Sequence, residues 1–308
     1  GPGIERITMS WPFVLLFLYF LFVLGFVTLK RIVSFRWRDV PFMLNHVGLF
    51  ITLLAAILGN GDLRRLRMTV PLENPEWRAS DDKNEMIELP LAIELRSFTI
   101  DEYPPKLMLI DNTTGKALPE KQPENILVEE IPLAGNLQGW KVEVTRSLPM
   151  AACVMGQDTV NFVEFHSEGA TTALYVKARN ELTGRQKEGW VSCGSYIFPY
   201  ISLQLDDAVS MVMPEREPQR FASEVKIYTQ EGTITEGTIE VNRPMEIEGW
   251  KIYQLSYDET KGRWSDVSVF ELVRDPWLPF VYAGIIMMMA GAVCLFVSAQ
   301  KRKEEDKA

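Results

Sequence analysis

Three long uncharged stretches interrupt an otherwise polar chain of 308 residues. They cover residues 7–29, 40–61 and 276–300, and nearly all the charged residues lie between the last two stretches. A helix rises about 1.5 Å per residue, so about 20 apolar residues cross the roughly 30 Å hydrocarbon core of a bilayer. The pattern therefore predicts three transmembrane helices, at about residues 10–29, at about 40–60 and at 276–300.

The first stretch has a second interpretation, as a secretory signal peptide. Only Arg6 precedes it, beside Glu5, and it shows no small-residue cleavage pattern. It also ends in Lys30 and Arg31, which favours a span that stays in the membrane. We interpret it as a retained transmembrane helix.

Basic residues in the short loops indicate the orientation of the chain. Lys and Arg next to membrane spans are held in the cytoplasm. We therefore expect the loop 30–39 and the tail 301–308 inside, and residues 62–275 outside. Arg64, Arg65 and Arg67 weaken this bias, but a segment as long as 62–275 is exported largely regardless of its charge. The basic residues of the loop and the tail are Lys30, Arg31, Arg36, Arg38, Lys301, Arg302, Lys303 and Lys307.

This orientation places the N-terminus outside without an earlier span to carry it there. Gly1 is also not a natural start. We expect a fragment that lacks its first transmembrane span, with Met9 as an alternative true start.

From residue 88 onward, short β-rich runs alternate with turn residues, and no long helical period occurs. This pattern is typical of an antiparallel sandwich or barrel-like domain. The expected fold class is therefore a membrane protein of α + β type, with a mostly antiparallel extracytoplasmic domain over residues 62–275. The predicted strands are Leu89–Ile100, Lys106–Ile110, Trp140–Thr145, Val160–Phe165, Thr172–Ala178, Tyr196–Leu205, Glu224–Tyr228, Thr235–Val241, Trp250–Tyr257 and Val267–Leu272.

Two Gly-Trp-Lys segments, which begin at Gly139 and Gly249, echo each other. Two similar β lobes would explain them. The simpler interpretation takes Trp140 and Trp250 as core anchors that each bury a large ring. The outer segment holds 36 acidic and 23 basic residues, which argues against nucleic acid as a partner.

The chain has three cysteines and no CxxC motif. Cys294 lies in the last span. Cys153 and Cys193 would both face an oxidising compartment, so they form either a disulfide or two buried free thiols. The spacing does not decide between these alternatives.

The C-terminal third resembles the ResB (CcsB) family of cytochrome c biogenesis proteins. The resemblance rests on the segment Val241-Asn242-Arg243-Pro244, on Gly249-Trp250-Lys251-Ile252-Tyr253-Gln254 with Ser256-Tyr257-Asp258, and on Arg274-Asp275-Pro276-Trp277. A second match is the span that opens with Asn45-His46-Val47-Gly48 and closes in Leu58-Gly59-Asn60-Gly61-Asp62. The likeness is strong over 40–67 and 220–298 and loose over 100–215. Family members usually have four spans, which agrees with a missing first one.

His46 is the candidate cofactor-binding and metal-ligating residue. It lies six residues past Val40, about 9 Å into the predicted helix. An ionisable side chain at that depth usually faces protein, a cavity or a ligand, so it either packs against a neighbouring span or binds a ligand. The resemblance implies an axial ligand to the iron of haem b. Its helix face also carries Phe50, Leu53 and Ile57, with Phe42 and Met43 a turn earlier, and this wall suits a porphyrin edge or lipid equally.

His166 is the only other histidine, and we interpret it as a loop residue. A bis-imidazole haem site would therefore need a histidine from another polypeptide. No catalytic triad, zinc spacing or phosphate-binding loop stands out.

The resemblance implies a subunit that delivers haem and attaches it to apocytochrome c outside the cytoplasmic membrane, acting with a CcsA-type membrane protein. Thiol reductant proteins are further expected partners, because the attachment needs reduced thiols. The chain has no tryptophan-rich WWD segment, so we expect an accessory subunit and assign no catalytic residue. The alternative is a non-catalytic membrane receptor or assembly scaffold with a ligand-binding β domain.

Overall fold

The computed structural model describes residues 10–34, 36–156 and 159–305. Met9 and Lys307 lie outside the described residues. Within them, three helices are long and apolar enough to cross a membrane: α2 (Trp11–Val33), α3 (Val40–Asp62) and residues Leu278–Val297 of α4 (Leu278–Glu305). The three predicted spans are thus confirmed as helices. A short 3-10 helix, η1 (Trp37–Asp39), leads into α3.

Local sequence explains where the helices begin. A proline stands at the first or second position of α2 and of α3, where the missing N–H costs nothing. Asp275 caps α4, because its Oδ1 accepts the backbone N–H groups of Trp277 and Leu278, each at 3.0 Å. The last turn of α2 holds Lys30 and Arg31, which complement the helix dipole.

Small residues allow α3 and α4 to approach closely. A Cβ added at Gly48 would lie 2.6 Å from the Gly284 carbonyl oxygen and 2.9 Å from the backbone nitrogen of Met288. A Cβ at Gly291 would lie 2.5 Å from the side chain of Asn45. Such small-residue contacts are how membrane helices associate, since burial of apolar surface gives no advantage over lipid.

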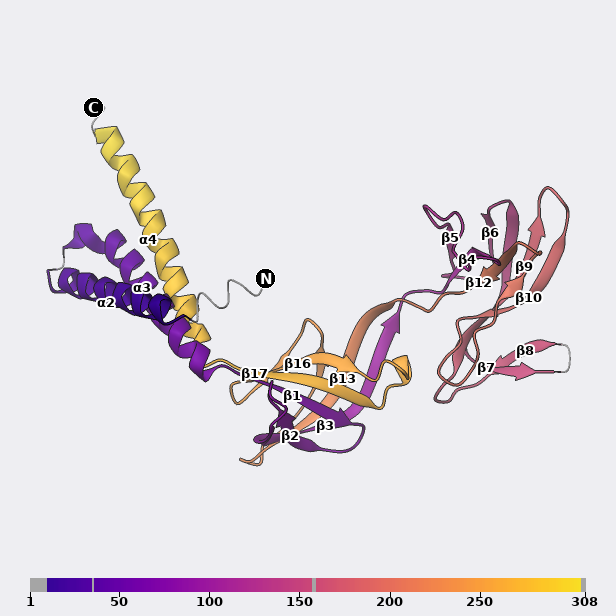
Figure 1. The fold of residues 1–308 in the computed structure, drawn as a ribbon, viewed down its shortest axis with the longest axis horizontal. Coiled ribbons are helices and arrows are strands. Elements are labelled where there is room, and N and C mark those ends of the chain that lie inside the picture. The colour runs from indigo at the N-terminus through magenta and orange to yellow at the C-terminus, as the bar shows by residue number, and fades with distance from the viewer. Residues whose placement is uncertain (1–9, 35, 157–158, 306–308) are drawn as a thin grey trace. The chain divides into compact units, whose positions relative to one another are not determined.

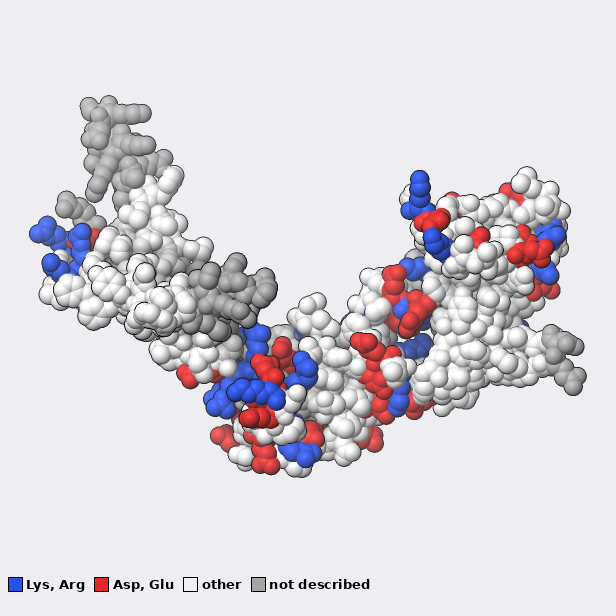
Figure 2. Space-filling model, in the orientation of Figure 1, with Lys and Arg blue, Asp and Glu red and all other residues white. Residues whose placement is uncertain are grey.

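The chain divides into two compact units. One holds the three helices with residues 246–251, and the other holds residues 66–245 and 252–271. Figure 2 shows that most of the helical surface on the visible face is uncharged, whereas blue and red side chains are spread over the β unit. This contrast is the one expected between lipid-facing and water-facing surfaces.

An eight-stranded sheet runs in the order β14-β13-β3-β2-β1-β17-β16-β15. Its long strands β3 and β13 pair antiparallel, side by side in Figure 1. The strands are β1 (Arg64–Pro71), β2 (Glu76–Ser80), β3 (Met86–Glu102), β13 (Pro218–Thr229), β14 (Ile234–Glu240), β15 (Met245–Ile247), β16 (Trp250–Tyr257) and β17 (Val267–Arg274).

This sheet curls until its two halves face each other. Ser223 on β13 donates its hydroxyl to Gln254 Oε1 on β16 at 2.6 Å and lies 2.8 Å from the hydroxyl of Ser268 on β17, although β13 is not a neighbour of either strand. The ring of Tyr257 stacks on Phe98 with centroids 5.2 Å apart. A fully buried polar group needs a partner, and this serine-glutamine cluster supplies one across the core.

The rest of the β unit forms two packed sheets. Their core joins Leu107 and Met211 of the smaller sheet with Val144 and Leu174 of the larger one. This is the two-layer arrangement expected of a sandwich. The smaller sheet has the order β11-β12-β4-β5, and the larger has β10-β9-β7-β6 with β8 beside β7. The strands are β4 (Lys106–Asp111), β5 (Asn125–Leu127), β6 (Leu133–Leu137), β7 (Trp140–Met155), β8 (Val160–Glu164), β9 (Thr171–Asn180), β10 (Gln186–Ser192), β11 (Leu203–Gln204) and β12 (Val209–Val212).

The two Gly-Trp segments form the same hairpin turn. The residue before each glycine and the glycine itself both have positive φ, at Gln138-Gly139 and at Glu248-Gly249. Such turns match the twist of two-residue hairpins. Trp140 and Trp250 follow directly and are each 3% exposed, which confirms them as core anchors.

The strand predicted over Tyr196–Leu205 is wrong for most of its length, since only β11 forms there. Gly194 has a φ of 74°, and the Ser195 hydroxyl oxygen accepts the N–H groups of Ile197 and Phe198. These contacts fold the segment into a loop. Pro199 adds a residue without an N–H for a ladder.

Candidate functional site

His46 lies in the second turn of α3, and its ring has a defined hydrogen bond. The Nδ1 atom is 2.9 Å from the carbonyl oxygen of Phe42, one turn earlier. A carbonyl oxygen only accepts, so Nδ1 donates this hydrogen bond, and in the neutral imidazole Nε2 is then the atom with the lone pair. Among the described residues, no group hydrogen-bonds Nε2. The imidazole is therefore in the tautomer that can coordinate a metal through Nε2.

Phe42 and Arg31 continue from His46 toward the loop between α2 and α3. The rings of Phe42 and His46 are stacked, with centroids 3.7 Å apart and planes 23° from parallel. The Arg31 guanidinium lies 4.8 Å from the centroid of Phe42. Arg31 also pairs with Asp39 at 3.4 Å. The Phe42 ring thus contacts both a cation and the imidazole.

The face of α3 that carries His46 is turned toward α2. Phe42 and Phe50 lie one turn before and one turn after His46, on the same side of the helix. Phe42 contacts Arg31 of α2, and a Cβ added at Gly25 of α2 would lie 2.9 Å from the Phe50 ring. His46 is only partly buried between these contacts.

The residues of the apolar wall expected around His46 have different surroundings. Phe42 and Phe50 contact α2, and Ile57 remains 36% exposed. Met43 lines an apolar cavity of about 170 Å³ with Val40, Leu44, Val47 and Met287.

His166 follows β8 and enters a turn, as predicted. Its side chain is 74% exposed, and Nε2 lies 3.8 Å from a carboxylate oxygen of Glu164, which is equally exposed. Within the described ranges, no group of three or more His, Cys, Asp or Glu side chains is placed to hold a metal ion. Among the described histidines, His46 is therefore the stronger candidate for a ligand role.

Cys153 and Cys193 are both free thiols in the structure. They pack against different hydrophobic clusters, Cys153 beside Phe162 and Cys193 beside Val191. Burial raises the pKa of the Cys153 thiol. Both are half-buried, so the alternative of free thiols is the one the structure supports, with more exposure than expected.

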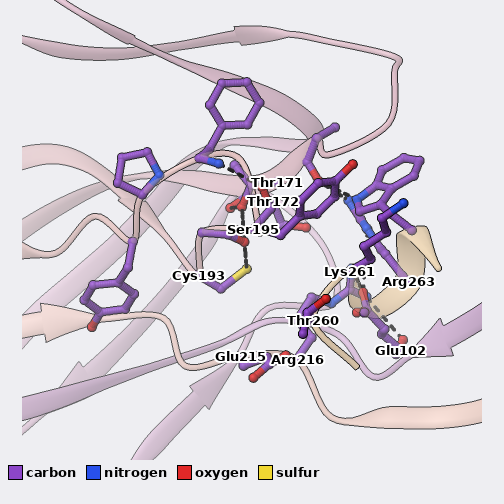
Figure 3. Close-up of a pocket in the computed structure, with 18 of the residues that line it drawn as sticks. Glu102, Thr171, Thr172, Cys193, Ser195, Glu215, Arg216, Thr260, Lys261 and Arg263 are labelled. Atoms are coloured by element: carbon purple, nitrogen blue, oxygen red, sulfur yellow. Dashed lines mark hydrogen bonds and ion pairs between the residues drawn. The ribbon is translucent and has the colours of Figure 1, made fainter. Parts of the chain in front are cut away.

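A second candidate site is a cleft of about 430 Å³ in the β unit, drawn in Figure 3. Arg216 and Arg263 share one carboxylate there, because their Nη1 atoms lie 3.1 and 3.6 Å from Glu102 Oε2. Burial lowers the pKa of Arg263, an effect that Glu102 opposes and Arg216 reinforces. The Cys193 thiol and the Tyr200 ring also line this cleft.

The arginines of this cleft serve mainly to join its walls. Arg263 and Trp264, in the 3-10 helix η2 (Gly262–Trp264), both donate to the carbonyl oxygen of Ala170, at 3.0 and 3.1 Å. Arg216 donates to the carbonyl oxygen of Tyr103 at 2.9 Å. Each guanidinium thus holds a backbone carbonyl oxygen as well as the Glu102 carboxylate. No motif signals this cluster in the sequence, because its members are widely separated along the chain.

A family model described as the ResB-like family matches residues 167–265, about a third of the chain. This segment is similar to the ResB-like family. The ResB-like segment runs from the loop before β9 to the end of η2, so it contains Arg216 and Arg263 but not His46. Comparison with curated proteins gives no match. The family match and the three apolar helices fit a multi-pass membrane protein involved in cytochrome c biogenesis.

Proposed function

We propose that this ResB-like chain is the subunit that delivers haem b and assists its covalent attachment to apocytochrome c, together with a CcsA-type membrane protein. We place it in a bacterial cytoplasmic membrane, with the β unit outside. The match to the ResB-like family over residues 167–265 supports the general role in cytochrome c biogenesis. The proposed role in haem delivery and attachment rests on His46.

The observation that carries the proposal is the free Nε2 atom of a membrane imidazole. Neutral imidazole is a common axial ligand of haem iron, and the bond from Nδ1 to the Phe42 carbonyl fixes the required tautomer. The partly buried, largely apolar surroundings also suit a porphyrin. His46 would hold the iron, and bound haem would supply the vinyl groups that are joined to the thiols of the apocytochrome.

The partner follows from the histidine count. The chain has two histidines, and His166 lies in the β unit beside Glu164. We infer that a second imidazole on the same iron comes from the partner. The absence of a tryptophan-rich segment in the sequence supports the same division, with the attachment chemistry on a CcsA-type partner.

A membrane receptor or assembly scaffold is the rival function. The observation in its favour is the cleft beside Arg216 and Arg263, which is large enough for a small ligand or a peptide side chain. In this alternative, His46 only packs against α2. The two functions differ in whether His46 affects bound haem.

His46→Ala, compared with His166→Ala, tests the proposal. In the purified complex with its partner, His46→Ala should lower the haem content and change the haem absorption spectrum, with protein level and assembly unchanged. Added imidazole should restore part of the spectrum by filling the vacated position, which a packing role does not predict. His166→Ala should match the wild type. An unchanged spectrum in His46→Ala would refute the ligand role and favour the scaffold.

A further inference from the structure

Arg31 is the cation that the structure connects to His46. Its guanidinium covers the Phe42 ring at 4.8 Å, and that ring stacks on the imidazole at 3.7 Å. The two contacts together keep the guanidinium within about 9 Å of the imidazole ring. Lys30 is the adjacent cation, and among the described residues its side chain makes no ion pair or ring contact with Phe42 or His46.

The Arg31 guanidinium has more N–H donors than its contact with Asp39 uses. A guanidinium offers five N–H groups. Among the described residues, that of Arg31 donates one side-chain hydrogen bond, to Asp39 Oδ1 at 3.4 Å. Exposed ion pairs of this kind are weak, and the Arg31 side chain is 48% exposed. The guanidinium can therefore donate hydrogen bonds to a second carboxylate without losing a strong existing contact.

The position of Arg31 also matches the chemistry of haem. A haem is apolar except for two propionate carboxylates on one edge, and a carboxylate near hydrocarbon needs a cation or water. Arg31 lies in the last turn of α2, and His46 lies in the second turn of α3. The chain passes from one to the other through a short loop, so Arg31 is on the side of His46 nearer to that loop and to water.

We propose that Arg31 binds a propionate carboxylate of the haem whose iron is held by His46. This inference rests on the proposed function. A guanidinium binds carboxylates through two parallel N–H groups, so Arg31 orients the haem with its propionate edge toward the loop between α2 and α3. Phe42 contacts both Arg31 and His46 and adds apolar surface beside them.

Titration of the detergent-purified full chain with ferric haem and with its dimethyl ester tests this assignment. The ester keeps the porphyrin and the iron but lacks the propionate charges. The wild type should bind the ester about tenfold more weakly than the acid, the range of a charge-assisted hydrogen bond. Arg31→Gln should bind the acid about as weakly as the wild type binds the ester, and esterification should then change its affinity less than twofold. Its absorption spectrum should remain that of imidazole-bound haem.

Two further variants separate the explanations. Lys30→Gln removes an adjacent charge and should keep the full effect of esterification, while His46→Ala in the same detergent measures partition of haem into micelles. The assignment would be overturned if esterification weakened binding equally in the wild type and in Arg31→Gln. It would also be overturned if esterification no longer weakened binding in Lys30→Gln. No imidazole-type spectrum in the wild type would refute the proposed function and this inference with it.

Discussion

Trp277 donates its indole N–H to the Asp62 carboxylate across 2.7 Å, which joins the last residue of α3 to the residue before α4. Gly59 allows this contact, since a Cβ there would lie 3.3 Å from Trp277 Cβ. Tryptophan is enriched at the membrane boundary, where one part of the indole is apolar and its N–H is wet. The pair thus fixes two helix ends at the same boundary of the membrane.

Trp277→Phe should destabilise the helical unit by about 1 kcal/mol, because it removes a hydrogen bond to a carboxylate while keeping an aromatic ring. Water reaches Asp62, which limits the loss. Thermal unfolding in detergent measures the change. Trp11→Phe is the control, since Trp11 is 75% exposed and should have no effect. Equal melting temperatures for Trp277→Phe and the wild type would contradict this role.

Gly48→Leu should separate α3 from α4. Its side chain would meet backbone atoms of α4 at 2.6 and 2.9 Å, and backbone cannot move aside as a flexible side chain can. Overpacking of this kind costs about 1–3 kcal/mol. Gly61→Leu is the matched control in the same helix, because a Cβ there meets nothing within 4 Å. A shift in unfolding temperature for Gly48→Leu but not for Gly61→Leu is the expected result.

Cys153 should react slowly with maleimide until the pH exceeds the ordinary range of a thiol. Burial raises its pKa, so less of the reactive thiolate is present at a given pH in the folded protein. The rate should rise to that of an ordinary cysteine when the chain is unfolded in denaturant. The measurement uses a variant with Cys193→Ser and Cys294→Ser. Identical pH profiles for the folded and unfolded chain would disprove the effect of burial.

The sequence predicts the helices well because length and lack of charge decide them. It also predicts β16 with the observed bounds, Trp250–Tyr257. It missed β1, although Leu66, Met68 and Val70 alternate with exposed residues and are at most 3% exposed. The arginines at the start of β1 made the alternation of buried and exposed residues difficult to recognise in the sequence.

The candidate site was predictable only in part. The depth of His46 follows from counting residues, but its tautomer depends on the rotamer that brings Nδ1 to the Phe42 carbonyl. The contact between Arg31 and Phe42 joins two helices, and sequence spacing does not give their packing. The cluster of Glu102, Arg216 and Arg263 unites distant parts of the chain, so only the fold reveals it.

Residues 62–275 should be accessible from outside intact cells, and the loop 30–39 and the tail should be protected. The basic residues of the two short segments are the reason. Single cysteines at Thr114, Ser34 and Glu304, in a background without the natural cysteines, can be labelled with an impermeant maleimide. Thr114→Cys should react at once, and the other two only after lysis. Strong labelling of Glu304→Cys in intact cells would reverse the proposed orientation.

The chain expressed alone should mature little cytochrome c, and coexpression with a CcsA-type protein should raise the yield at least tenfold. The physical reason is incomplete coordination: His46 offers one imidazole in the membrane, and His166 is an exposed residue of the β unit. Covalent haem in a reporter cytochrome, measured after denaturing electrophoresis, gives the yield. Coexpression with His46→Ala should lose most of the gain if this imidazole completes the site, whereas His166→Ala should keep it. A single subunit that matures the reporter as well as the pair does would show that the chain needs no partner histidine, and the division of roles proposed for it would then be wrong.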